Sequence, residues 1–152
     1  MSNIAVIGGS GFAAMPGLVA LGEELPDTAY GRPSGAIVHG RLEGGGELLF
    51  LPRHGPQHRI PPHRINYRAN IAALKACGAE RVLGLAAVGG IGPDCGPRSL
   101  VIPDQLIDYT CGRHQTFSTA AARRSLISTS RTPIANPCGR TCCSPESASG
   151  SP

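Results

Sequence analysis

Residues 66–90, NYRANIAALKACGAERVLGLAAVGG, decide the fold class of this chain. Apolar residues recur at helical spacing in the first half, which predicts an amphipathic helix over Asn66–Gly78 that Gly78 caps at its C-terminus. The second half is a continuous apolar run into Gly89-Gly90, which predicts a buried strand over Arg81–Val88. A helix followed by a strand that enters a glycine loop is typical of α/β proteins.

The N-terminal region repeats the strand-to-glycine pattern. Ile4–Ile7 is a short apolar run before Gly8-Gly9-Ser10-Gly11, which predicts another buried strand that ends in a glycine loop. Two more predicted strands, Ala36–His39 and Glu47–Leu51, flank the glycines at 44–46 and would form a hairpin.

Composition excludes several classes of protein. The chain has 152 residues and 41% hydrophobic residues, enough for one domain with a core, and it contains no apolar stretch of about 18 residues that could span a membrane. The N-terminus lacks a basic region, so we expect a cytoplasmic protein. The six cysteines show no paired CxxC spacing, so we expect neither a disulfide framework nor a metal site.

The chain changes character near residue 118. Residues 99–103 and 105–109 still suggest strand or extended chain, but residues 118–152 are rich in Ser, Pro and Arg and contain no aromatic residue. Such a segment buries too little apolar surface to offset the entropy of ordering, which predicts disorder. Most of the net charge of +4 falls in this tail and therefore says little about partners, nucleic acid included.

Gly8-Gly9-Ser10-Gly11 is the first candidate binding site. Glycines let backbone amides approach an anion and the Ser10 hydroxyl adds a donor, so the loop suits a phosphate. Two alternatives stay open: a tight turn without a ligand, and a dinucleotide-binding loop. The second needs an acidic residue at the end of a further strand, and Glu23 and Glu24 follow no strand-like run.

Arg53-His54 is the second candidate. Arginine offers a bidentate fork to phosphate and the adjacent imidazole can add a hydrogen bond. His54, His58 and His63 could instead suggest a metal, but no carboxylate or cysteine accompanies them, and nearby prolines argue against a helix that would align two imidazoles. The remaining alternative is that these are ordinary polar loop histidines that bind no ligand.

Ala86-Ala87-Val88-Gly89 is the third candidate, because ligands bind at the carboxyl ends of strands in α/β sheets. Such junctions are common, so this signal is weak on its own. Asp104 and Asp108 could share a face of an extended segment, but structural caps or turn residues explain them as well as an acid–base pair does.

Three strings together resemble the trimeric purine nucleoside phosphorylase family, in its methylthioadenosine/methylthioinosine phosphorylase branch. They are IAVIGGSGF at 4–12, FLPRHGPQHRIPPHRINYRANIAALKACGAERVLGLAAVGGI at 50–91 and LVIPDQLIDYTCGR at 100–113. The resemblance covers roughly residues 3–117. It implies a mixed-sheet, three-layer α/β fold that is incomplete here, with residues 1–117 as the N-terminal part of the domain and 118–152 as a non-family tail.

The resemblance also implies a reaction. Inorganic phosphate would attack the anomeric carbon of a purine (methylthio)nucleoside, with no metal or organic cofactor, and release the base. On matched positions, the phosphate-binding residues would be Gly9, Ser10, Gly11, Arg53, His54, Ala86 and Ala87, and the substrate-binding residues Val88 and Gly89. The resemblance implies a homotrimer for intact relatives, and an incomplete sheet with exposed edges argues against that assembly here.

Two departures from the family pattern weaken the expected activity. Ala86 stands where family members often place Thr or Asn, and a lost hydrogen bond to a buried anion costs about 1–3 kcal/mol. Nothing after Phe117 resembles the purine-contacting half of the family, so we expect little or no turnover.

The tail itself suggests why that half is missing. With free choice of third codon bases, residues 127–137 read one nucleotide back can spell IDFTHPYRQS, similar to a family stretch HVDFTHPY expected at this point. We therefore hypothesise a frameshift near 113–117. The gene sequence tests this, and the hypothesis fails if no intact shifted frame continues beyond the stop codon.

Two rival functions stay open. A non-catalytic phosphate- or nucleotide-binding module would use Gly8–Gly11 and Arg53-His54 without chemistry. An RNA-binding role for the Arg- and Ser-rich tail is weaker, since its arginines are scattered without the aromatic residues that stack on bases.

Overall fold

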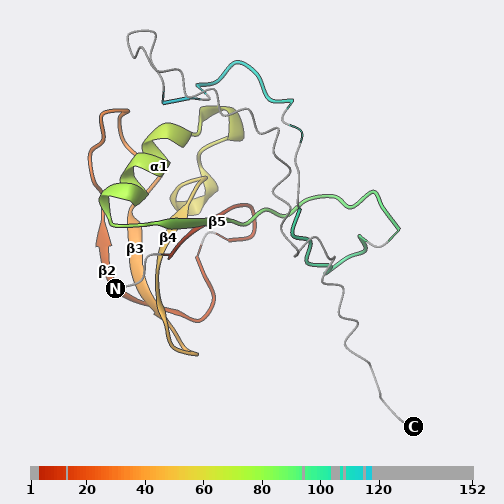
Figure 1. Cartoon of the computed structure of the whole chain (residues 1–152), viewed down its shortest axis with the longest axis horizontal. Helices are drawn as coiled ribbons and strands as arrows, with labels where there is room; N and C mark the ends of the chain where they lie inside the picture. The colour runs from red at the N-terminus through yellow and green to blue at the C-terminus, as the bar shows by residue number, and fades with distance from the viewer. Residues whose placement is uncertain are drawn as a thin grey trace. The chain divides into compact units, whose positions relative to one another are not determined.

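A mixed five-stranded sheet forms the centre of the computed structural model, which describes residues 4–12, 14–93, 95–103, 107, 109–114 and 116–117. The strands are β1 (Ile4–Gly8), β2 (Leu18–Glu24), β3 (Ile37–Leu42), β4 (Glu47–Pro52) and β5 (Arg81–Gly84). Their order in the sheet is β2-β3-β4-β1-β5 (Figure 1). The predicted α/β class with a mixed sheet is confirmed.

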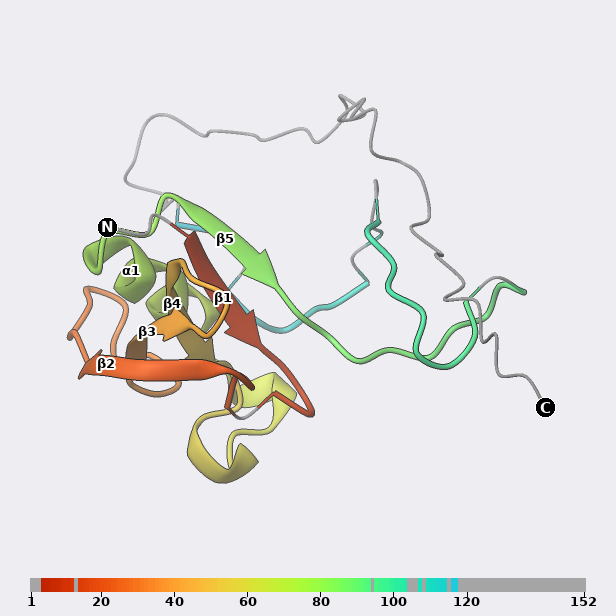
Figure 2. The ribbon, with the colours of Figure 1, turned by 90° about the horizontal axis from the view of Figure 1, so that it is seen from below.

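Strands β4, β1 and β5 are neighbours in the sheet and run parallel to one another. Strands β2, β3 and β4 form an antiparallel meander. In Figure 2, β1 and β5 lie side by side and β2 lies at the opposite edge. The β3–β4 hairpin and the two strands before glycine loops were predicted from the sequence. Parallel strands end at the same edge of a sheet, so their loops are brought together there.

One α-helix, α1 (Tyr67–Ala76), lies between β4 and β5 in the chain and confirms the predicted helix. The Asn66 side chain caps its N-terminus by accepting a hydrogen bond from the amide of Ala69 at 3.1 Å. At the other end Gly78 adopts φ 86°, and the amides of Gly78 and Ala79 donate to the carbonyls of Lys75 and Leu74. This is a Schellman cap, which explains why the chain needs glycine at 78.

Alternating side chains of β1 and β4 build two apolar clusters, one on each face of the sheet. Ala5, Leu49 and Leu51 pack with Ala73 and Leu74 of α1 on one face. Val6, Leu48 and Phe50 form the other cluster, against which Met15 and Leu18 pack. In β5, by contrast, Val82 and Leu83 are exposed.

The strand predicted over Arg81–Val88 is shorter in the structure and ends at Gly84. Within the described part of the chain β5 pairs with β1 alone, and the last pair is Ile7 with Gly84. The amide of Leu85 still donates to the carbonyl of Ile7, and there the pairing stops because β1 turns into its glycine loop. The strand prediction was wrong beyond Gly84 because an apolar run does not show where its partner ends.

β2 was not predicted, and the statement that Glu23 and Glu24 follow no strand was wrong. Val19 and Leu21 are apolar but exposed on this edge strand. The sequence of β2 therefore does not show the alternation of apolar and polar residues that predicts a half-buried strand. Backbone pairing with β3, interrupted by a bulge between Ala20 and Gly22, holds it in place. The dinucleotide alternative nevertheless fails, because β2 is not a neighbour of β1 and no helix follows Gly11 in described residues 12 and 14–17.

The chain divides into two compact units, residues 1–87 with 112–119 and residues 88–111 with 120–152. All strands and helices named above belong to the first unit. The described residues of the second unit, which lie within 88–111, contain no helix or strand, so residues 99–103 form no strand there. Predicted disorder over 118–152 concerns residues outside the described ranges.

Helix α1 is ten residues long, too short to cross a bilayer, and none of the described helices has the length and apolar composition of a membrane span.

We expect Cys77, the C-cap residue of α1, to react slowly with iodoacetamide. Burial, a hydrogen bond to Glu24 and the charge of that carboxylate raise the pKa of the Cys77 thiol to about 11. At pH 8 only about one thiol in a thousand would be ionised, against roughly one in four for an ordinary thiol of pKa ~8.5. Site-resolved mass spectrometry of the alkylated chain measures the rate. Glu24→Gln should speed alkylation and the nearby Asp27→Asn should not; an ordinary rate in the parent chain would contradict the prediction.

Candidate anion-binding site

Three parallel strands deliver three segments to one edge of the sheet. β1 ends at Gly8, β4 at Pro52 and β5 at Gly84, and the pairings align Gly8 with Pro52 and Ile7 with Gly84. The amide of Arg53 continues the ladder by donating to the carbonyl of Gly8 at 3.0 Å. The Gly9–Gly11 loop, Arg53-His54 and residues 85–87 therefore leave the sheet side by side.

The Arg53 side chain connects these segments. Its Nη1 donates to the carbonyl oxygen of Leu85 at 2.9 Å, and its Nε donates to Nε2 of His54 at 3.3 Å. The guanidinium also lies directly over Gly9, since a Cβ built on Gly9 would stand 2.6 Å from its Cζ. Arg53 is held from two sides in a fixed orientation, which is how a cationic binding group is preorganised.

The charge of Arg53 has no carboxylate partner among the residues that the structure describes. The ion pairs found among the described residues join Arg32 with Asp27, His39 with Glu24, and Arg41 with Glu47. A half-buried guanidinium without an acidic partner is costly unless an anion neutralises it. The arrangement therefore favours an anionic ligand.

The Gly9–Gly11 loop adds uncharged donors beside that guanidinium. A turn forms where the amide of Phe12 donates to the carbonyl of Gly9 at 2.9 Å, and Gly11 adopts φ 84°. The amides of Ser10 and Gly11 have no hydrogen-bond acceptor among the described residues. Successive unpaired amides in a turn with one left-handed residue form a concavity that binds anions. Because no helix begins here, this loop depends on amides rather than on a helix dipole.

His54 has a different position from the one the sequence suggested. The side chain is buried, with Nδ1 at 2.9 Å from the carbonyl oxygen of Ile60, while Nε2 accepts from Arg53. These contacts assign the neutral tautomer with the proton on Nδ1. Both ring nitrogens are occupied, so the structure makes His54 a residue that orients Arg53.

His58 is the imidazole that faces the glycine loop, and the sequence did not predict it as a site residue. Its ring lies against that of His54 with centroids 4.2 Å apart, and its Nε2 is 3.5 Å from Oγ of Ser10. Gln57 and His58 have positive φ angles of 59° and 58°, which cost free energy in residues with a Cβ. The sequence placed three histidines in this loop, and no pattern in it distinguished His58 from the others.

His63 lines a separate hollow of about 440 Å³ with Tyr30, Asn66 and Arg113. The histidines at 54, 58 and 63 do not form a group that could hold a metal ion within the described part of the chain.

Ala86 and Ala87 follow β5 with exposed side chains that carry no polar atom, so only their backbone could bind a ligand. Val88 and Gly89 belong to the second unit, where the Val88 side chain is 82% exposed. Asp104 and Asp108 lie outside the described residues. The candidate site therefore consists of Gly9, Ser10, Gly11, Arg53, His54 and His58, with the Leu85 carbonyl as the anchor of Arg53.

We expect Gly9→Ala to weaken phosphate binding while leaving stability nearly unchanged. The added methyl would overlap the Arg53 guanidinium, which can swing away because it is the end of a flexible side chain. The phosphate dissociation constant should rise by at least about tenfold, equivalent to one charge-assisted hydrogen bond of about 1.5 kcal/mol. Isothermal titration with phosphate measures the change. Gly22→Ala is the matched control, since a Cβ there meets open space; equal affinities for the two variants would contradict the prediction.

Comparisons with known proteins agree with the fold. The chain is 54% identical over 114 residues to a probable S-methyl-5'-thioinosine phosphorylase of Xylella fastidiosa (strain 9a5c), which is 75% of this chain and 48% of that protein. It is 49% identical over 116 residues to a purine nucleoside phosphorylase of Streptomyces coelicolor, covering 76% of this chain and 40% of the relative. The chain spans about half the length of the curated relatives it matches.

Solved structures give the same picture. A variant of adenosine/methylthioadenosine phosphorylase from Schistosoma mansoni in complex with methylthioadenosine superposes with a TM-score of 0.71 at 37% identity, covering 78% of this chain and 42% of that one. Methylthioadenosine phosphorylase of the same organism without ligand gives a TM-score of 0.69 at 39% identity, over 75% of this chain and 40% of that one.

The model of one protein family matches residues 3–143, which includes every strand, the helix and all residues of the candidate site. That match extends past residue 117, the predicted end of the family-like part of the chain. The boundary at residue 117 stays a prediction. With the sheet, the site and these relatives in agreement, the chain belongs to the phosphorylase superfamily.

Proposed function

We propose that this chain is the phosphate-binding part of a purine (methylthio)nucleoside phosphorylase, a pentosyltransferase that transfers the pentosyl group to inorganic phosphate and releases a purine base. The main support is Arg53, a guanidinium held over Gly9 without a carboxylate partner among the described residues. The choice of nucleoside rests on the names of the relatives, which point to methylthioinosine or methylthioadenosine as the substrate.

The proposed reaction explains why the site contains cationic and neutral donors. Phosphate oxygen forms a bond to the anomeric carbon while the bond from that carbon to the purine nitrogen breaks, and the sugar gains positive charge in the transition state. Arg53 and the amides of Ser10 and Gly11 would hold the phosphate in place, so that its negative charge faces the sugar. The His58 imidazole and the Ser10 hydroxyl would add hydrogen bonds to the same anion.

The remaining assignments extend this proposal. The backbone of Ala86 and Ala87 would complete the phosphate contact, and Val88 and Gly89 would contact the nucleoside. Phosphate is the co-substrate, and we propose that the reaction uses no metal and no organic cofactor. We also propose a cytoplasmic location and small-molecule partners only, with a trimer in intact relatives.

A phosphorolysis assay of the full chain with methylthioinosine, methylthioadenosine and inosine tests the activity. We expect phosphate-dependent base release far below the ordinary range of about 1–10³ s⁻¹, because no described residue is assigned to protonate the purine. Turnover within that range would contradict the expected weakness. Phosphate binding without any phosphate-dependent base release would instead favour the non-catalytic binding module.

A further inference from the structure

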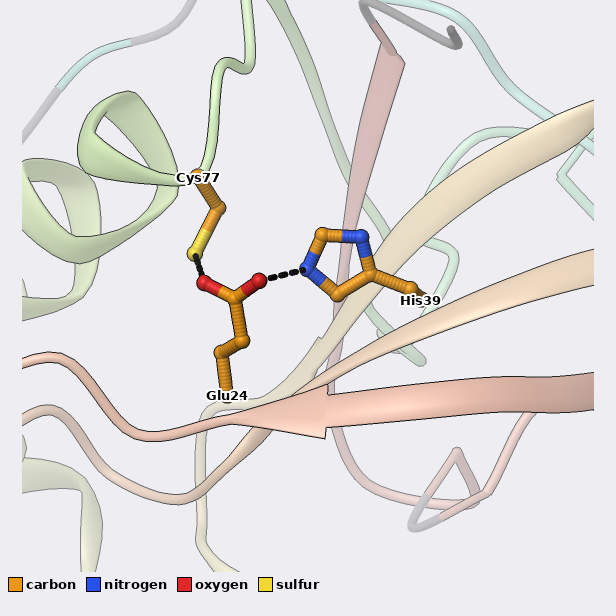
Figure 3. A group of neighbouring side chains, drawn as sticks. All are labelled: Glu24, His39 and Cys77. Carbon is orange, nitrogen blue, oxygen red and sulfur yellow. Dashed lines mark hydrogen bonds and ion pairs between the residues drawn. The ribbon is translucent and has the colours of Figure 1, made fainter.

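Glu24, His39 and Cys77 form a cluster apart from the Arg53 site. They come from the end of β2, from β3 and from the C-cap of α1 (Figure 3). Sγ of Cys77 lies 3.5 Å from Oε2 of Glu24, and Nε2 of His39 lies 3.3 Å from Oε1 of the same carboxylate. One ligand atom from each residue lies within 4.8 Å of the other two, and no other such group occurs within the described part of the chain.

We propose that Glu24, His39 and Cys77 bind a zinc ion. A thiolate, an imidazole nitrogen and a carboxylate oxygen are the three ligand types that zinc takes in proteins. Magnesium and calcium prefer oxygen ligands alone, so the cysteine and the histidine select against them. The site is independent of the phosphorylase proposal.

A tetrahedral zinc ion requires a small closure of the cluster. With a zinc–sulfur bond of about 2.3 Å and zinc–nitrogen and zinc–oxygen bonds of about 2.0–2.1 Å, tetrahedral angles place nitrogen and oxygen about 3.3–3.4 Å apart and sulfur and oxygen about 3.5 Å apart. Nε2 of His39 is 3.3 Å from Oε1 of Glu24 and Sγ of Cys77 is 3.5 Å from Oε2, so these two distances use different oxygens of the carboxylate. With one of these oxygens as the ligand, the three ligand atoms lie within 4.8 Å of one another, and each pair must close by at most about 1.5 Å to reach tetrahedral geometry.

The surroundings of the cluster support an ion rather than a simple ion pair. Nε2 of His39 is buried and makes no hydrogen bond of suitable geometry, although the Glu24 carboxylate is near. A small hollow of about 120 Å³ lies beside His39 and Cys77 and is lined by Leu21, Leu48 and Leu49 together with Gly40 and Glu47. It has room for a water molecule as the fourth ligand.

A bound ion would join elements that the core does not hold together. β2 is an edge strand with exposed apolar residues, and among the described strands its backbone pairs with β3 alone. A zinc ion would tie the end of β2 to the C-terminus of α1. Binding to the folded chain raises its stability, so zinc should raise the melting temperature.

Co²⁺ binding tests the proposal in the full chain with Cys95, Cys111, Cys138, Cys142 and Cys143 replaced by serine, so that Cys77 is the one thiol left. Circular dichroism checks that this background keeps its fold. We expect one Co²⁺ per chain with a thiolate-to-metal charge-transfer band, and displacement of the Co²⁺ by one equivalent of Zn²⁺. The native chain gives a second measurement, in which Cys77→Ser should lower the number of tightly bound zinc ions by one.

Variants of each ligand separate a site from general binding. Glu24→Gln and His39→Gln in the same background should each weaken zinc binding by more than the 10- to 100-fold that an outer-shell partner typically contributes. Glu23→Gln, the adjacent exposed carboxylate, should leave the affinity unchanged. A charge-transfer band that survives Cys77→Ser, or equal zinc affinities for Glu24→Gln and Glu23→Gln, would overturn the proposal.

Discussion

Replacing Arg53 by alanine is expected to weaken phosphate binding by about 10- to 150-fold, the equivalent of about 1.5–3 kcal/mol for a hydrogen bond to a charged group. The guanidinium is the one cationic group fixed over the Gly9–Gly11 loop by contacts to Leu85 and His54 within the described part of the chain. Its loss leaves only neutral donors there. Isothermal titration of the full chain with phosphate at constant ionic strength measures the change.

Arg59→Ala is the matched control, because Arg59 is exposed in the loop that carries His54 and His58 and the substitution removes the same charge. Its effect on phosphate affinity should be within about twofold, since exposed charges are screened by salt. Arg53→Lys should recover only part of the affinity, because lysine cannot contact Leu85, His54 and the anion with one planar group. Equal losses in Arg53→Ala and Arg59→Ala would show that net charge, not the site, binds phosphate.

The parts of the fold that sequence predicted have strong local signals. Local structure follows directly from three features of the sequence. They are the apolar run at 4–7 before the glycine-rich segment 8–11, the helical spacing of apolar residues after Asn66, and Gly78 at the end of the helix. β2 lacked such a signal, because its place depends on pairing with β3 and not on its own alternation. The early end of β5 is also a property of its partner β1.

The candidate site divides in the same way. Glycine loops and Arg53 were predicted because their chemistry is local and specific to anions. The role of His54 as the residue that orients Arg53, and the approach of His58 to Ser10, depend on the conformation of residues 55–58 with its positive φ angles. The Glu24–His39–Cys77 cluster could not be predicted from the sequence, since its members are 15 and 38 residues apart and form no spacing motif. Tertiary packing alone brings them together.

Leu74→Ala is expected to lower the free energy of unfolding by about 2–5 kcal/mol, the usual cost of deleting a fully buried leucine side chain. Leu74 is 0% exposed, and it packs with Ala5, Leu49 and Leu51 in the cluster that joins α1 to the sheet. A domain of this size has about 5–15 kcal/mol of stability in total, so the loss would be a large fraction of it. Urea denaturation followed by circular dichroism measures the change.

Ile71→Ala tests whether burial is the cause, because Ile71 lies one turn earlier in α1 but is 37% exposed. Its truncation should cost less than about 1 kcal/mol, since little apolar surface returns to water and alanine has the higher helix propensity. Leu74→Met should restore most of the stability because it refills the cavity with a flexible side chain of similar volume. Equal destabilisation by the two alanine variants would show that burial of Leu74 against the sheet is not the cause of the loss.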